Sequence, residues 1–344
     1  MDEKPNSTKI KHDKDYSIVM YACNTDTRLL QRSLEAVKRL DTRGLLTELI
    51  LVDHNSTTPL STLGFVQAHA GQDQSFVVLR FTGPAVKYAC TAALEAAQGR
   101  FTVFIDAGSE PAPGYLQELK KLHERFPQVG IWGAGNVSVE FIDGIDGKIE
   151  AYARTAFQER HTSELDFYIE KEWEASCPSG AGLCAYTFLL KEYDHKVHQG
   201  TFTQPTLKHR RTGGAEDAQI VMLCVQMGYP AGVSPTLQLN RLVPRSQANR
   251  KYLQQLAWGT SLEHETCMLE VFPERRPLLL RRLMPEKRFA RLALRRIVKA
   301  TWHRDPMKKF ELIRFLSNNA GIYAALSRPL PPTVARIIRF MTFG

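Results

Sequence analysis

Two apolar strands that each end on an aspartate constrain the fold of this chain most. Residues 48–53 read ELILVD and residues 101–106 read FTVFID, so each run delivers one carboxylate, Asp53 or Asp106, into a turn. Such runs, separated by amphipathic segments, are typical of a parallel sheet covered by helices on both faces. Ligands of these sheets bind beyond the carboxyl ends of the strands. We therefore expect the two aspartates at one site, although an aspartate there can also serve only to cap a turn.

The neighbouring segments complete an α/β pattern. The sequence predicts further strands at 16–21, 76–81 and 137–142, helices at 27–40, 86–98 and 151–175, and a glycine-rich turn entering an apolar run at 178–190. The glycine-rich turn lacks the spacing and the Lys-Ser/Thr pair of a phosphate loop. Strand and helix alternation predicts a mainly parallel, doubly wound sheet flanked by helices.

An acidic pair stands at the predicted start of a later helix. Residues 213–223 read GGAEDAQIVML, which places Glu216 and Asp217 in the first turn. Acidic residues are favoured there by the helix dipole and by capping. The pair is thus either a helix cap or part of a site.

Cysteines and apolar runs exclude several classes of protein. The six cysteines are scattered and form no C-x-x-C pair, which argues against a zinc site or a dithiol redox centre and favours reduced thiols. The first residues, MDEKPNSTKIKHDKDY, lack the apolar core of a signal peptide, and no run reaches the roughly 18 apolar residues of a membrane span. A cytoplasmic location is expected.

Positive charge is concentrated near the carboxyl end. Residues 275–314 contain fourteen lysines and arginines against three acidic residues, whereas the whole chain carries a net charge of +9. Residues 278–300, LLLRRLMPEKRFARLALRRIVKA, mix these cations with apolar residues at helical spacing. This pattern favours a helix lying in the interface of an anionic membrane, and an ordinary packing helix is the alternative. A nucleic-acid partner is not expected, because no nucleic-acid-binding motif accompanies the charge.

The order of the motifs resembles a family 2 glycosyltransferase of the GT-A fold. The resemblance rests on YSIVMYACN, on Asp53 with Asn55 and Ser56, on a helix with Lys87, on FIDAGSEPAPGYL, on GAGLCAYTFLL and on GGAEDAQIVMLCVQMGYP. It implies a polar leader at 1–14, a GT-A domain at 15–260 and a basic, amphipathic helical extension at 261–344.

Four further stretches resemble a bacterial branch of that family found among surface-polysaccharide and lipopolysaccharide enzymes. They are IWGAGNVSVEFIDG, FQERH, GYPAGVSPTLQLNRLVP and ANRKYLQQLAWGTS. The branch has an Asn-His-Leu-Ile run where this chain has Asn240, Arg241, Leu242 and Val243. An arginine can face a diphosphate, but it cannot act as a general base.

The resemblance implies an inverting, hexosyltransferase-like reaction. A sugar would pass from a nucleotide diphosphate sugar to a hydroxyl of a surface glycan or lipid-linked acceptor, at the inner face of the cell membrane. The resemblance implies that Asp217 is the general base and that Glu216 orients it or is the second candidate for the base. It implies nucleoside contacts for Asp53, Asn55 and Ser56, and diphosphate contacts for Lys87 and Arg241. Asp106 would be a ligand of Mg²⁺ or Mn²⁺.

One position departs from the family's metal motif, Asp-x-Asp. Gly108 stands where the second carboxylate would fall, so Glu110 would reach the ion, Ser109 would hold it through water, or metal dependence would be weak. Two alternatives to the transferase therefore stay open. One is a non-catalytic or weakly active module that binds a sugar nucleotide or glycan. The other is a nucleotidyltransferase, although residues 22–24, Ala-Cys-Asn, stand where its glycine-rich loop would be.

Overall fold

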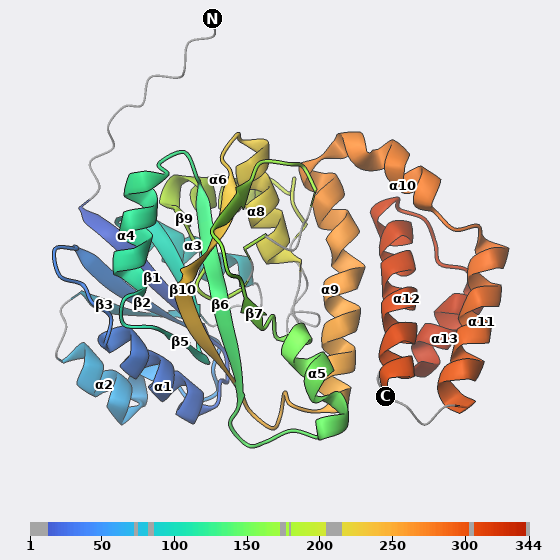
Figure 1. Ribbon diagram of the computed structural model, residues 1–344, viewed down its shortest axis with the longest axis horizontal. Coiled ribbons are helices and arrows are strands. Elements are labelled where there is room, and N and C mark those ends of the chain that lie inside the picture. Colours follow the sequence, from blue (N-terminus) through green and yellow to red (C-terminus); the bar gives the residue numbers. More distant parts are fainter. Residues whose placement is uncertain are drawn as a thin grey trace, which may run out of the picture.

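A mixed sheet and a set of C-terminal helices make up the molecule (Figure 1). The computed structural model describes residues 13–71, 75–81, 86–172, 177–178, 180–203, 215–302 and 306–341. In Figure 1 the sheet and its covering helices lie on the left, and α9 stands between them and the remaining C-terminal helices on the right.

The strands form one sheet in the order β3-β2-β1-β4-β9-β6-β10-β5, with β7 added to β6 and β8 to β10. Their bounds are β1 (Lys14–Ala22), β2 (Thr47–His54), β3 (Phe76–Phe81), β4 (Gly99–Asp106), β5 (Ser109–Pro111), β6 (Ile131–Phe141), β7 (Arg160–His161), β8 (Asp166–Tyr168), β9 (Cys184–Tyr186) and β10 (Ala231–Val243). The long pairs β1–β2, β1–β4, β2–β3 and β6–β10 are parallel, whereas the short strands pair antiparallel. The carboxyl ends of β1, β2 and β4 consequently meet at one edge.

Helices cover the sheet and continue beyond it. Their bounds are α1 (Thr27–Lys38), α2 (Gly64–Ala70), α3 (Val86–Ala96), α4 (Tyr115–Arg125), α5 (Gly147–Ala156), α6 (Thr187–His198), α8 (Glu216–Gln226), α9 (Arg250–Val271), α10 (Arg276–Arg282), α11 (Glu286–Trp302), α12 (Pro306–Ala325) and α13 (Pro332–Met341), with 3₁₀ turns η1 (Leu60–Thr62) and η2 (Pro273–Arg275). The expected α/β sheet flanked by helices, with a C-terminal helical extension, is confirmed.

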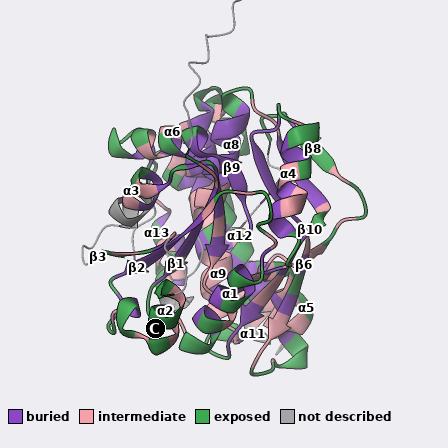
Figure 2. Cartoon of the chain, turned by 90° about the vertical axis from the view of Figure 1, so that its left-hand side faces the viewer, coloured by how far each residue is buried: buried purple, intermediate pink, exposed green. Residues whose placement is uncertain are grey.

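The strands are buried because apolar side chains cover both of their faces. In β2, every residue from Glu48 to His54 is buried, and Ile50, Leu51 and Val52 are fully enclosed. Figure 2 shows this buried interior running through the middle of the molecule, with exposed residues on the outer faces of the helices. A sheet enclosed in this way is a rigid mount for groups at the ends of its strands.

The helix predicted at 151–175 is wrong over most of its length. α5 ends at Ala156, and Gln158 takes a left-handed backbone conformation with φ of 65°. The chain then leaves the helix to add β7 to β6 and β8 to β10. The charged and aromatic composition of this segment suggested a helix. Its backbone groups instead form hydrogen bonds with the long strands β6 and β10.

The C-terminal helices form a packed unit with its own apolar core. On α11, Phe289 and Ala293 are fully buried with Leu316 of α12 and Val334 of α13. That side of α11 is therefore an ordinary packing face, which was the alternative to the membrane interpretation. In the part of the chain that the structure covers, no helix has the length and hydropathy needed to cross a bilayer. α9 runs without a break through residue 260, where the domain boundary was expected.

Candidate active site

The turn after β4 presents Asp106 and holds the following residues in place. The Asp106 side chain is about half exposed, at 51%. The hydroxyl oxygen of Ser33 on α1 accepts hydrogen bonds from the backbone N–H groups of Gly108 and Ser109, at 2.8 and 3.0 Å. The carbonyl of Gly108 accepts another from Leu242 on β10, at 2.7 Å. Asp106 therefore projects from a turn that is held by hydrogen bonds to α1 and to β10.

Glycine at position 108 is required by this turn. Its φ is 122°, a conformation that residues with a Cβ rarely adopt, and a Cβ there would lie 3.4 Å from the Leu242 carbonyl oxygen. An aspartate at this position would be strained, and its side chain would start toward β10. The backbone conformation at position 108 therefore disfavours a second carboxylate there, in agreement with the sequence.

Glu110 is bound to other residues than Asp106. Its carboxylate accepts two hydrogen bonds from the Arg32 guanidinium, both at 2.9 Å, and one from the Asn240 amide at 3.0 Å. Arg32 and Asn240 also bind Glu140. Because both Glu110 oxygens already accept hydrogen bonds from Arg32 and Asn240, this side chain is poorly placed to bind a metal ion, and its metal role stays a prediction.

Asp217 lies in the first turn of α8, with its carboxylate held by the backbone. The N–H of Gly180 donates to Asp217 Oδ2 at 2.9 Å. The pKa of the Asp217 carboxyl is raised to about 6, chiefly by burial and next by the negative charges of Asp106 and Glu216, whereas the Gly180 hydrogen bond and the Arg241 charge act to lower it. Glu216 and Asp217 share the first turn of α8, Asp106 Oδ2 lies 3.7 Å from Arg241 Nη2, and Gly180 lies next to both Asp217 and Arg241. The structure thereby gathers four of the predicted residues, and Asp217 has the basicity of a general base near neutral pH.

Arg241 projects from β10 toward the same carboxylates. Its Nη2 lies 3.7 Å from Asp106 Oδ2, and its guanidinium carbon lies 5.9 Å from the centre of the Phe157 ring. The side chain is mostly enclosed, with 27% exposed. Together with Arg160 and Gln158 it lines a small cavity beside β6 and β10. The site thus contains a fixed cation as well as a base.

Asp53, Asn55 and Ser56 lie together at the end of β2. Asp53 is 1% exposed, and its two oxygens accept hydrogen bonds from the backbone N–H groups of Ser56 and Leu60, at 3.1 and 3.0 Å. Asn55 is exposed with φ of 54°, whereas Ser56 is buried and its hydroxyl accepts from the N–H of Asn24 at 3.2 Å. Asp53 and Ser56 shape the loop, and Asn55 faces solvent. Their nucleoside contacts stay a prediction.

The described residues leave two predictions, the diphosphate contact of Lys87 and the metal site, without direct support. The side chain of Lys87 on α3 lies outside them, so its diphosphate contact stays a prediction. No group of three or more His, Cys, Asp or Glu among the described residues is placed to hold a metal ion.

Sequence reasoning missed the residues that fix the site. Gly180 was seen only as part of a glycine-rich turn, and Ser33 and Arg32 only as polar positions on a helix. Gly180 has φ of 69° and holds Asp217, whereas Ser33 and Arg32 hold the turn after β4 and Glu110. These contacts join segments far apart in the chain, so local pattern carried no signal for them.

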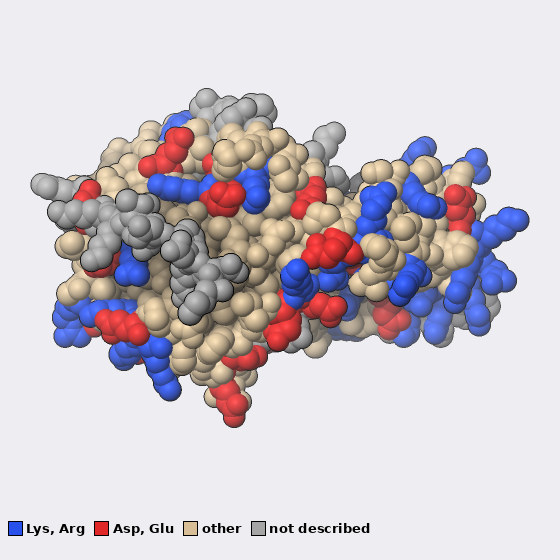
Figure 3. All heavy atoms as spheres, turned by 90° about the horizontal axis from the view of Figure 1, so that it is seen from above, with Lys and Arg blue, Asp and Glu red and all other residues tan. Residues whose placement is uncertain are grey.

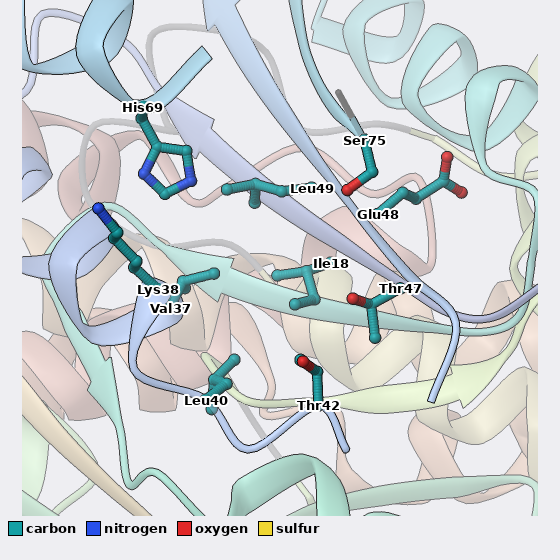
Figure 4. Close-up of a pocket in the computed structure, with 10 residues that line it drawn as sticks. All are labelled: Ile18, Val37, Lys38, Leu40, Thr42, Thr47, Glu48, Leu49, His69 and Ser75. Atoms are coloured by element: carbon teal, nitrogen blue, oxygen red, sulfur yellow. The ribbon is translucent and has the colours of Figure 1, made fainter. Parts of the chain in front are cut away.

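The cavity in Figure 4 lies away from this site. It opens beside the amino end of β2, where Thr47, Glu48 and Leu49 lie with Lys38 of α1 and His69 of α2 (Figure 4). The Glu48 carboxylate in its wall already accepts hydrogen bonds from the Ser17 hydroxyl at 2.5 Å and the Gln98 N–H at 2.7 Å. The carboxyl edge of the sheet, with its base and its cation, is the stronger candidate.

Comparison with known proteins agrees with the resemblance over the first half of the chain. Residues 17–172 match the family described as Glycosyl transferase family 2. The matched segment contains Asp53, Asp106 and Glu110, whereas Glu216, Asp217 and Arg241 follow it. With this match, the mixed curled sheet, its flanking helices and the C-terminal helices are consistent with a GT-A fold, as expected.

Solved structures similar to this chain include those of TarS from S. aureus. The crystal structure of S. aureus TarS 1-349 has a TM-score of 0.47 and 13% identity, over 89% of this chain and 90% of that one. The same protein in complex with UDP has a TM-score of 0.44 and 14% identity, over 89% and 90%. A search of curated proteins found no match.

Proposed function

We propose that this protein is an inverting glycosyltransferase. It would move a sugar from a nucleotide diphosphate sugar to a hydroxyl of a surface glycan or lipid-linked acceptor. The observation that carries the proposal is the Asp217 carboxylate, held by the Gly180 N–H beside Asp106 and Arg241 at the carboxyl edge of the sheet. The family 2 match of residues 17–172 supports glycosyl transfer as the class of reaction.

In the proposed reaction Asp217 removes the proton from the acceptor hydroxyl. The acceptor oxygen forms a bond to the anomeric carbon while the bond from that carbon to the phosphate oxygen breaks on the opposite face. The proton passes to the Asp217 carboxylate, and the electron pair of the broken bond leaves with the nucleoside diphosphate. The negative charge of Glu216 makes Asp217 a stronger base by raising its pKa.

The described residues do not fit the two-carboxylate metal site that the resemblance implies. Gly108 offers no side chain, both Glu110 oxygens already accept hydrogen bonds from Arg32, and Asp106 already faces Arg241 at 3.7 Å. Mg²⁺ or Mn²⁺ stays a prediction from the resemblance. The steps proposed above use only groups of the chain itself.

Donor hydrolysis and transfer by the purified protein test the proposal. A panel of UDP-, GDP- and dTDP-sugars is offered with simple glycan acceptors, and Asp217→Asn is compared with wild type. Asp217→Asn should lower turnover by about 10²–10⁴-fold with donor binding retained, because the amide cannot accept the proton. The matched control is Asp166→Asn, an exposed residue of β8, which should retain full activity. Equal turnover by wild type and Asp217→Asn would overturn the mechanism.

Gly108 favours a second candidate, a module that binds a sugar nucleotide or glycan without turnover. It follows from the missing second carboxylate of the metal motif. Donor binding by wild type with no turnover on any acceptor of the panel would support this candidate, and turnover that depends on Asp217 would exclude it.

We also propose that the protein acts at an anionic membrane surface, with α10 and α11 facing the lipid. Four apolar side chains on these helices are left exposed, namely Leu278, Leu280, Leu294 and Val298, at 41, 45, 47 and 60%. Exposed cations surround them, including Arg291 and Arg295 on either side of Leu294. Lysine and arginine side chains gather over this end of the molecule in Figure 3. Apolar residues set among cations suit the interface of an anionic bilayer.

A further inference from the structure

We infer that the Arg241 guanidinium supplies the positive charge that binds the donor's diphosphate, in place of a metal ion resident on the protein. The inference rests on the proposed function and concerns how the same site handles the charge of the leaving group. Any transferase of this kind must counter the charge that builds on the departing phosphate. The structure provides a fixed cation for that task where it lacks a second carboxylate.

The donors of Arg241 make no hydrogen bond to any residue that the structure describes. Within that part of the chain, its nearest carboxylate oxygen, on Asp106, is 3.7 Å away. Two half-buried arginines behave differently: Arg32 binds Glu110 and Glu140, and Arg154 binds Glu150 and Glu159. A mostly enclosed arginine whose planar set of donors is free can bind a phosphate with two parallel hydrogen bonds.

Arg241 is mounted rigidly. It lies opposite Val139 of β6 and Ser109 of β5, so β10 is held on both sides at this residue. The Phe157 ring lies beneath the guanidinium, and cation–π contacts of this kind stabilise a cation without using its N–H donors. Little rotational freedom therefore remains to be lost when a ligand binds.

Gly180 brings the cation and the base to the same place. A Cβ built on Gly180 would lie 3.5 Å from Arg241 Nη1, and the N–H of Gly180 holds the Asp217 carboxylate. One backbone residue therefore holds the base and lies next to the cation. A donor whose diphosphate is bound by Arg241 would have its anomeric carbon within reach of an acceptor that Asp217 deprotonates, which is the arrangement that transfer needs.

A second guanidinium lines the same cavity. Arg160 donates from Nη1 and Nη2 to the Cys177 carbonyl, both at 3.1 Å, and no carboxylate pairs with it among the described residues. It adds positive charge to the wall beside Arg241. The Asp106 carboxylate orients Arg241, but its negative charge repels a diphosphate and so weakens binding.

Binding of nucleoside diphosphates to the full chain tests the inference. UDP, GDP and dTDP are titrated by calorimetry in EDTA and again in Mg²⁺, with wild type, Arg241→Ala, Arg241→Lys and Asp106→Asn. The matched control is Arg245→Ala, which removes an equal charge from an exposed residue two positions after β10. Thermal unfolding of each variant establishes that it is folded.

If Arg241 is the diphosphate cation, wild type binds one of these nucleotides equally well in EDTA and in Mg²⁺. Arg241→Ala then weakens binding by about 10- to 100-fold, as expected for lost charge-assisted hydrogen bonds. Arg241→Lys gives a smaller loss, and Arg245→Ala gives almost none. Asp106→Asn keeps or improves the affinity, because a repelling carboxylate is removed.

Three results overturn the inference in distinguishable ways. Binding that requires Mg²⁺ and is lost in Asp106→Asn would reject Arg241 as the replacement cation and leave the transferase proposal standing. Absence of binding by folded wild type in either condition would reject both. Metal-free binding that Arg241→Ala does not weaken would assign the charge to other cations.

Discussion

At the scale of single residues, the balance of charges around Asp217 governs the site. Asp106 and Glu216 raise the pKa of its carboxyl, whereas Arg241 and the Gly180 N–H lower it, with burial as the largest cause. The result is a pKa of about 6, well above the usual value for an aspartate. A carboxylate that is ionised at pH 7 and still basic suits the removal of a proton from a hydroxyl.

The pH profile of transfer should report this carboxyl. Below about pH 6 the Asp217 carboxylate is protonated and cannot accept a proton, so kcat/KM should fall about tenfold per pH unit there. Glu216→Gln should move this limb to lower pH, because it removes a charge that raises the pKa. The matched control Asp166→Asn should leave the limb in place. A flat profile between pH 7 and pH 5 would contradict Asp217 as the base.

At the scale of elements, the ends of β4 and β10 and the first turn of α8 build the site. The strands and their aspartates could be predicted, because buried strands appear in the sequence as continuous apolar runs. In a parallel sheet the carboxyl ends of such strands lie at the same edge. The start of α8 at Glu216 was predicted equally well from its acidic pair. The contacts of Glu110 were not, because Arg32 of α1 and Asn240 of β10 reach it from two separate segments. The helix predicted at 151–175 failed because pairing with β6 and β10 outweighed local composition.

Ser33 should be important for stability because it joins α1 to the turn after β4. Ser33→Ala would leave the buried N–H groups of Gly108 and Ser109 without their acceptor. We expect the free energy of unfolding to fall by about 1–3 kcal/mol, measured by urea denaturation. The matched control, Ser61→Ala at an exposed position, should cost less than about 0.5 kcal/mol. Equal stability of the two variants would contradict the role assigned to Ser33.

At the scale of the whole molecule, the excess of positive over negative charge lies in the C-terminal helices, whereas the site lies at the sheet. The apolar side of α11 is buried against α12 and α13, so the sequence pattern alone assigned too large an apolar surface to the membrane. Only the described structure separates the apolar residues that pack, such as Phe289, from those left exposed, such as Leu294.

Flotation with liposomes tests the membrane proposal on the full chain. The double variant Leu294→Ser with Val298→Ser should reduce binding to vesicles that contain anionic lipid by about tenfold, because two exposed apolar side chains no longer enter the interface. The matched control is Leu46→Ser, an equally apolar residue that is 61% exposed on the sheet-bearing part. Wild type should not float with purely zwitterionic vesicles. Equal flotation of wild type and the double variant would contradict the proposal.

α9 connects these two ends of the molecule. It packs against α8, which begins at the acidic pair, and against α12. The Gln219 amide on α8 also donates to Glu270 on α9 at 2.7 Å. Under the membrane proposal, α9 would be a rigid spacer. With the basic helices on a lipid surface, it would set how high above that surface Asp217 stands and which way the proposed donor site opens. A lipid-linked acceptor would then be met at a fixed distance from the bilayer.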